Sequence, residues 1–183
     1  VLFRSERNGL FQFGAPNTFQ AGQTGFNQPL ESATYFSRRI GATQPILGGG
    51  RYSGKTGIFN VGLMDIQTKD DGGHDGQNFG VARVKADISR RSTVGAIFTN
   101  VQGDGRTNRA AGADLALRFW GASALNGWIA NVWDPRFAGS TGAGNANLFL
   151  RNDRYSYQFD YLNVGRHFDP AMGYIRQIGR AHV

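Results

Sequence analysis

From residue 46 onward, apolar and polar residues alternate with the period of two that a β-strand imposes on its two faces. In residues 79–88 the apolar side chains occupy even positions, whereas Arg83, Lys85 and Asp87 share the opposite face. Residues 113–119 and 154–161 repeat this pattern, and the second run sets aromatic against polar positions. Such runs favour antiparallel strands with one apolar and one polar face. We therefore predict an all-β chain that forms an up-and-down antiparallel sheet of about seven strands.

The predicted connections differ in length. Short turns are expected at 54–57, 89–92 and 121–123, and longer loops at 68–78, 103–108 and 134–147. In an up-and-down sheet, strict alternation of short and long connections places the short turns at one end and the long loops at the other. This asymmetry, with strands of about 10 to 12 residues, is typical of outer-membrane β-barrels.

Aromatic residues lie near the predicted strand ends: Phe119, Trp120 and Trp133. Membrane barrels carry aromatic girdles at this level, where strands meet the two interfaces. The core of a soluble β-sandwich would explain these residues equally well, but it would need a second sheet. The loop pattern favours the membrane.

Residues 49–56, GGRYSGKT, match the letters of a phosphate-binding loop. That site requires a helix after Thr56, because the helix N-terminus faces the phosphates. The residues that follow instead fall on one face at strand spacing: Phe59, Val61 and Leu63. We therefore predict a tight hairpin turn at 53–57 with Lys55 solvated in it, and P-loop nucleotide binding stays a remote alternative.

Composition and charge narrow the function classes. The 27 glycines, 5 prolines and 13% aromatic residues favour β structure, and the absence of cysteine excludes disulfides and cysteine metal sites. The formal net charge of +7 comes from 20 basic and 13 acidic residues. The basic residues are scattered through strand-like runs rather than gathered in a stripe or a recognition helix, so nucleic acid is not expected as a partner.

The two ends of the chain differ from the rest. Residues 1–5 and 178–183 can be encoded by nearly reverse-complementary DNA that resembles a sequencing adapter, and both are set aside from fold reasoning. Residues 6–45 are predicted to be an irregular lead-in and residues 46–177 a partial β-barrel. We expect a metagenomic fragment whose native termini and signal peptide lie outside this sequence.

The carboxylates offer the main enzymatic hypothesis. Glycoside hydrolysis needs two carboxyl groups that flank a sugar bond. Four aspartates lie in strand-like runs: Asp65, Asp87, Asp114 and Asp160. The alternation favours a water-facing interior in which they pair with Arg83, Arg118 and Arg154.

Other candidate chemistry is sparse. Residues 70–76 could hold Ca²⁺ through clustered carboxylates, but they depart from the twelve-residue calcium loop and are predicted to form an external hydrophilic loop. His74 and His167 are too few for a histidine metal cluster. No catalytic, cofactor-binding or metal-ligating residue is assigned, and no cofactor is expected.

Several segments together resemble one family. They are residues 6–13, 35–41 (YFSRRIG), 46–49 (ILGG), 53–57 (SGKTG) and 164–176 (VGRHFDPAMGYIR). In order and spacing they are similar to uncharacterised bacterial outer-membrane proteins. In these proteins a domain of unknown function forms a β-barrel after an N-terminal sandwich similar to carbohydrate-binding module family nine.

The resemblance implies a Gram-negative outer-membrane location with lipid as the partner, and carbohydrate binding through a domain upstream of this chain. It also implies further strands downstream, and it carries over no catalytic residue. The hypothesis is thus a fragment of an integral outer-membrane β-barrel that acts as a conduit or as an anchor for the upstream domain. The alternative is a β-rich carbohydrate-active hydrolase.

Overall fold

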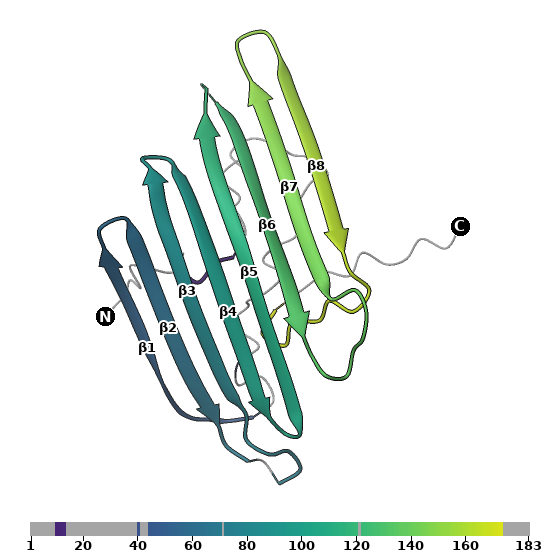
Figure 1. Cartoon of the computed structure of the whole chain (residues 1–183). Coiled ribbons are helices and arrows are strands. Elements are labelled where there is room, and N and C mark those ends of the chain that lie inside the picture. Colours follow the sequence, from purple (N-terminus) through teal and green to yellow (C-terminus); the bar gives the residue numbers. More distant parts are fainter. Residues whose placement is uncertain (1–9, 14–39, 41–43, 71, 121, 174–183) are drawn as a thin grey trace.

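A computed structural model of the chain describes residues 10–13, 40, 44–70, 72–120 and 122–173. This part forms one antiparallel sheet in which every strand pairs with its neighbour in sequence (Figure 1). The strands are β1 (Ile46–Thr56), β2 (Phe59–Thr68), β3 (Asn78–Ser89), β4 (Ser92–Gly103), β5 (Arg106–Phe119), β6 (Ser123–Trp133), β7 (Gly142–Arg151) and β8 (Ser156–Val164). The predicted all-β, up-and-down architecture is confirmed. The strand number is eight rather than about seven, and within the described residues no pairing joins β8 to β1.

The connections at the two ends of the sheet differ in length. The turn end, at the top of Figure 1, carries the short connections 57–58, 90–91, 120–122 and 152–155. The loop end carries 69–77, 104–105 and 134–141. The predicted strict alternation is therefore wrong at one place, because the loop expected at 103–108 is a two-residue turn. The last loop is also shorter than predicted, since β7 already begins at Gly142.

The tight turn between β4 and β5 has a simple cause in the sequence. Asp104 has a φ of 53° and Gly105 a φ of 65°, so both central residues are left-handed. Two positive φ values define a type I′ turn, and Asp-Gly is one of the dipeptides that favour it. The dipeptide brings β4 and β5 into register from Gly103 and Arg106 onward.

The hairpin between β1 and β2 is confirmed, but its turn lies further along the chain than predicted. Thr56 pairs with Phe59, so residues 53–56 belong to β1 and the turn is Gly57-Ile58. Lys55 is consequently a strand residue and not a turn residue; it is solvent-exposed as predicted, and its Nζ lies 2.8 Å from Asp87 Oδ2. A strand follows the turn, so the helix that a phosphate-binding loop needs is not there and the P-loop hypothesis is wrong.

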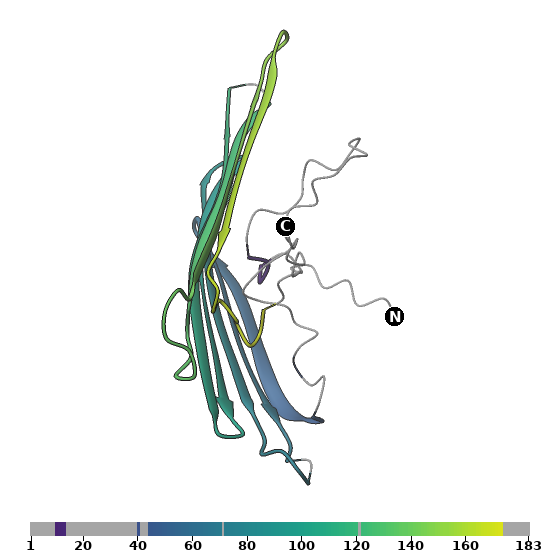
Figure 2. The same ribbon diagram turned by 90° about the vertical axis from the view of Figure 1, so that its right-hand side faces the viewer.

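The buried residues gather on one side of the sheet. Figure 2 shows the sheet edge-on, with the short segment 10–13 and the stretch after β8 both lying on the same side. Leu10, Phe11 and Phe13 are 7%, 5% and 2% exposed. They form one hydrophobic cluster with sheet residues and with Phe168 and Met172. The described part of the predicted irregular lead-in, residues 10–13, thus packs against the sheet. The structure does not describe residues 1–9, 14–39, 41–43 and 174–183. Segment 35–41 of the resemblance therefore lies outside the described residues, apart from Ile40.

The type I′ turn gives a test of the local argument. Gly105→Val should lower the free energy of unfolding by about 1–2 kcal/mol, because a branched side chain is strained at positive φ. Gly50→Val is the matched control, since a Cβ at Gly50 would meet nothing within 4 Å and the position is an ordinary strand site. Chemical denaturation followed by tryptophan fluorescence measures both; equal stability of the two variants would contradict the turn assignment.

Candidate functional site

The sheet has two chemically different faces. The face that carries Ala82 and Val84 of β3 is called the outer face. The face that carries Val81 and Arg83 is called the inner face. The antiparallel registers extend each assignment across all eight strands. Segment 10–13 contacts the inner face, because the guanidinium of Arg83 donates a hydrogen bond to the carbonyl of Leu10.

The outer face is a continuous apolar surface. Its apolar residues are Phe59, Val61 and Leu63 of β2; Ala82, Val84, Ala86 and Ile88 of β3; Val94, Ala96 and Phe98 of β4; Ala111, Ala113, Leu115, Leu117 and Phe119 of β5; Leu125 and Ile129 of β6; Ala146, Leu148 and Leu150 of β7; and Tyr157, Phe159 and Tyr161 of β8. Asn131 of β6 and Asn163 of β8 are polar residues of the same face. Among the larger ones, Phe98 is 44% exposed and Ile129 68%. A contiguous apolar surface of this extent on a soluble monomer is unusual and marks an interaction site.

A polar row ends this apolar surface near the loop end. Asp65 pairs with Gly80, Gly80 with Asn100, and Asn100 with Arg109, so three polar side chains lie in one line across four strands. Arg109 Nε donates to Asn100 Oδ1 at 3.1 Å. Asp65 accepts from the Asn78 amide at 3.1 Å. Along the strands towards the loop end, the outer face therefore changes from apolar to polar at this row.

The height of the apolar surface can be estimated from strand geometry. On β5 it extends from Ala111 to Phe119, which is eight residue steps or ~27 Å at about 3.4 Å per step. A tilt of roughly 40° reduces the height to ~21 Å, close to the apolar band of about 25 Å of membrane barrels. The outer face therefore has the dimension as well as the chemistry of a hydrocarbon-facing surface.

Large aromatic side chains lie at both margins of the apolar surface. Trp120 and Tyr155 are 83% and 57% exposed at the turn end, and Trp133 is 53% exposed at the loop end. Phe119 meets Trp120 edge to face, with ring centroids 5.4 Å apart. Amphipathic rings at such margins are typical of membrane interfaces. The tryptophans that the sequence placed near strand ends are exposed and do not belong to a sandwich core.

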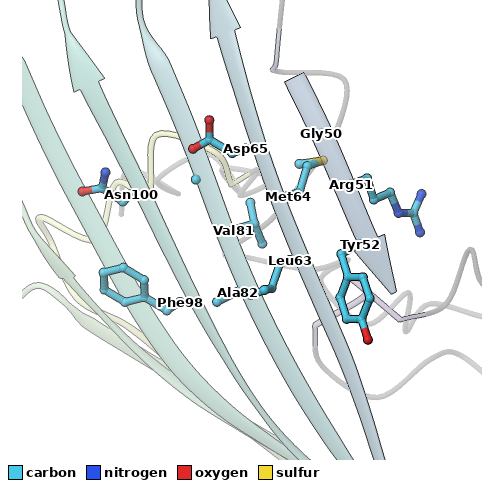
Figure 3. Close-up of a pocket in the computed structure, with 11 residues that line it drawn as sticks. Gly50, Arg51, Tyr52, Leu63, Met64, Asp65, Val81, Ala82, Phe98 and Asn100 are labelled. Atoms are coloured by element: carbon cyan, nitrogen blue, oxygen red, sulfur yellow. The ribbon is translucent and has the colours of Figure 1, made fainter. Parts of the chain in front are cut away.

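A shallow groove of about 530 Å³ marks the outer face near β1 (Figure 3). Tyr52 and Phe98 stand on either side of it, and Leu63 and Ala82 lie between them. Asp65 and Asn100 of the polar row line its loop-side end. The groove presents mainly apolar walls, and its titratable lining residues are Arg51, Tyr52 and Asp65, so it offers little for chemistry.

The inner face is polar towards the turn end, and its polar side chains contact one another. Lys55 and Asn60 both donate to Asp87, at 2.8 and 3.2 Å. Arg118 Nη1 donates to the side-chain oxygen Oδ1 of Asn126 at 3.2 Å. On β7 and β8, the Asn147 amide donates to Asp160. A polar face of this kind suits a water-facing interior rather than the core of a soluble protein.

Arg83 is the most deeply buried charge of the inner face. Its side chain is fully buried, and its Nη2 donates to both oxygens of Asp114, at 2.9 and 2.7 Å. Its Nε donates to the Leu10 carbonyl at 3.3 Å, and its guanidinium lies 5.6 Å from the centroid of the Phe13 ring. A buried cation is tolerated when it is paired and hydrogen-bonded in this way. Arg83 therefore joins β3, β5 and segment 10–13 through one group.

A second polar cluster lies at the loop end of the inner face. Asn108 is 1% exposed and donates to Asp134 at 2.9 Å. Arg136 binds the same carboxylate through two nitrogens, at 2.8 and 2.6 Å. These Arg136 hydrogen bonds, with that of Asn108, hold the pKa of Asp134 well below its usual range although burial opposes the shift. The same contact raises the pKa of Arg136 above its ordinary value.

The four candidate carboxylates do not form one site. Asp65 lies on the outer face, while the others lie on the inner face of three different strands. Asp114 pairs with Arg83 as predicted, but Asp87 pairs with Lys55. Arg154 lies in the turn before β8 and outside the strands.

The remaining candidates have structural contacts. His74 Nδ1 lies 3.1 Å from Asp104 Oδ2, and His167 stacks on Phe137 with ring centroids 5.5 Å apart. In the segment 70–76, a carboxylate oxygen of Asp70 accepts from the Gly76 amide. Among the described residues, no group of three His, Cys, Asp or Glu side chains is arranged to hold a metal ion.

Comparison of the chain with protein-family models, curated proteins and solved structures found no match. In the part of the chain that the structure describes, no helix is long and apolar enough to span a membrane. The site is therefore characterised by its own geometry: an apolar, water-exposed outer face and an inner face that holds nearly all strand charges.

The buried ion pair gives a test of the inner face. Asp114→Ala should lower the free energy of unfolding by about 3–5 kcal/mol, because it leaves the Arg83 cation buried without its partner. Asp160→Ala removes an exposed carboxylate from the same face and should change stability little. Urea titrations of both variants measure the difference; equal losses would mean that Arg83 is not buried.

The Asp134–Arg136 contact predicts a pH dependence. Because the pKa of Asp134 is lowered in the folded protein, its contribution to stability is complete above the ordinary aspartate pKa of about 4 and is lost as the pH falls towards the folded pKa. The stability difference between the parent and Asp134→Asn should therefore be largest at neutral pH and shrink between about pH 4 and pH 2. A difference that grows on acidification would contradict the assignment.

Proposed function

We propose that the sheet is part of the wall of an integral β-barrel in the bacterial outer membrane, with its outer face against lipid. One observation carries this proposal: the outer face is largely apolar and no described segment covers it, while nearly all strand charges lie on the other face. Within the strands, only Asp65 and Arg109 are charged residues of the outer face. The inner face carries Arg51, Lys55, Arg83, Lys85, Asp87, Arg106, Asp114, Arg118, Arg151 and Asp160.

A soluble β-protein would bury the face that is exposed here. In a sandwich, a second sheet covers the apolar face and the polar face meets water. In this sheet, the described segments that pack on it, 10–13 and 165–173, cover the inner face instead. Lipid is the neighbour whose chemistry fits an uncovered apolar band between aromatic margins.

The connection lengths support an orientation in the membrane. Outer-membrane barrels have short periplasmic turns and longer external loops. We therefore place the turn end of the sheet in the periplasm and the loops 69–77 and 134–141 outside the cell. The resemblance of the sequence adds a carbohydrate-binding-like domain upstream of residue 6, for which this wall would be the membrane anchor.

The proposal is tested by placing one charge at two depths of the same strand. Ala96→Arg lies on β4 in the middle of the apolar surface, whereas Asn100→Arg lies on the same strand and face in the polar row. In a bilayer, an arginine near the midplane should cost about 2–4 kcal/mol and one near the interface about 0–1 kcal/mol. Folding of each variant from urea into phospholipid vesicles measures the two costs.

The same pair of variants separates the membrane from water. Ala96 is already solvent-exposed in the isolated sheet, so an arginine there should be harmless in a water-soluble protein. Equal folding of the two variants in vesicles would overturn the proposal. So would a parent protein that stays monomeric and folded in buffer without detergent or lipid.

A further inference from the structure

The chain covers part of its own inner face. Segment 10–13 and the stretch 165–173 lie on the inner side of the sheet in Figure 2, far apart in sequence but close in space. Trp128 of β6 contacts both: its ring centroid is 5.9 Å from that of Phe13 and 6.5 Å from that of Phe168. We call these two segments, with Trp128 between them, the inner plug. The plug is a packed unit, because its residues belong to one hydrophobic cluster with the sheet.

The sheet has two recesses that receive the plug. A Cβ added at Gly62 would lie 2.8 Å from Phe11 Cζ and 3.0 Å from Leu10 Cδ2. A Cβ at Gly112 would lie 2.5 Å from Phe13 Cζ. Any larger side chain at these two positions would occupy the place of an aromatic ring. Glycine on the inner face is therefore required by the close approach of the plug.

Polar contacts fix the plug at both of its segments. Arg83 holds the first segment through the Leu10 carbonyl, and Arg51 lies over the Phe11 ring with its Cζ 4.8 Å from the centroid. Asn108 holds the second segment: its amide donates to the Asp169 carbonyl at 3.0 Å, and its carbonyl oxygen accepts from the Ala171 amide at 2.9 Å. The plug is thus bound by specific hydrogen bonds as well as by apolar contact.

The plug covers the central strands in the loop-side half of the inner face. Thr99, Asn108 and Val132 of these strands are 2%, 1% and 1% exposed, and Met172 of the plug is 0% exposed. Towards the turn end the inner face stays accessible on β1 and β3, since the side chains of Lys55 and Asp87 are 50% and 36% exposed. The boundary lies near the row of Gly62, Arg83 and Gly112.

We propose that the inner plug closes the interior of the wall, so that the barrel in its resting state does not pass water or solutes along this part of its inner face. The inference rests on the proposed membrane location and deepens it. While the plug covers the inner face, the barrel serves as a membrane anchor and not as a conduit. Displacement of the plug would expose the polar inner face and convert the anchor into a conduit.

Single cysteines test the plug, since the chain has none of its own. Thr99→Cys lies on the inner face beneath the plug, and Gln158→Cys is the matched control on the exposed inner face of β8. In the full chain, folded in vesicles or detergent, a charged thiol reagent should label Thr99→Cys at least 100-fold more slowly than Gln158→Cys. Comparable rates would overturn the proposal.

Two second-site changes then remove the plug in different ways. Gly112→Leu fills the recess of Phe13, and Phe13→Asp removes the ring without altering the sheet. Each should raise the labelling rate of Thr99→Cys at least 10-fold while that of Gln158→Cys is unchanged. Retention of the β-sheet circular dichroism spectrum identifies the variants that have stayed folded. Continued protection of Thr99→Cys in a folded Phe13→Asp variant would overturn the proposal.

Vesicle leakage provides the functional readout. Vesicles containing the parent chain should retain a small charged dye, and those containing Phe13→Asp should release it at least 10-fold faster. Equal retention by both, with Thr99→Cys exposed in the variant, would mean that the plug does not control passage. Failure of the parent to insert contradicts the membrane location instead, while the labelling in detergent still decides whether the plug exists.

Discussion

The structure depends on a constraint of single sheets: each strand sends alternate side chains to opposite faces, and both faces need a suitable neighbour. Here the two neighbours differ. The inner face is covered in part by segments 10–13 and 165–173, and the outer face by nothing that the structure describes. Apolar side chains such as Phe59, Phe98 and Ile129 would be unfavourable in water at the exposure they have. The membrane proposal follows from this imbalance and not from any single residue.

Arg83 connects the inner face to the plug. A fully buried guanidinium would be costly alone, and two of its nitrogens have partners: Nη2 donates to Asp114 and Nε to the Leu10 carbonyl, whereas Nη1 is buried without a hydrogen bond. The position of segment 10–13 therefore helps to stabilise a charge that belongs to the sheet. Conversely, the sheet selects the position of the segment, since Gly62 and Gly112 leave room for its rings. The plug therefore depends on the sheet for its position, and the sheet depends on the plug for a partner of its buried charge.

Much of the fold could be predicted from the sequence, because period-two alternation is a local property. The faces of residues 79–88 and 113–119 are as expected, and so is the turn at Arg90-Arg91. The turn at Asp104-Gly105 differs from the longer loop predicted at 103–108, although the Asp-Gly dipeptide is a strong local signal for a tight hairpin.

The inner plug could not have been predicted in the same way. Residues 10–13 show no strand periodicity, and their burial depends on sheet residues and on Phe168 and Met172, all far away in the sequence. The one local hint was the concentration of apolar side chains in Leu10, Phe11 and Phe13. Asn108 likewise looks like any polar strand residue in the sequence. Its role arises only because Asp134, Asp169 and Ala171 converge on it in space.

The edges of the sheet set the last physical requirement. In hydrocarbon, unpaired backbone groups cost several kcal/mol each, so open sheet edges are not found facing lipid. All nine residues of β8 are exposed, and β1 pairs on one side only. A membrane location therefore requires that other strands pair with β1 and β8 and close the wall. The inner face already has the polar character that closure would enclose. Among the basic residues that lie in strands, alternation directs all except Arg109 to this face.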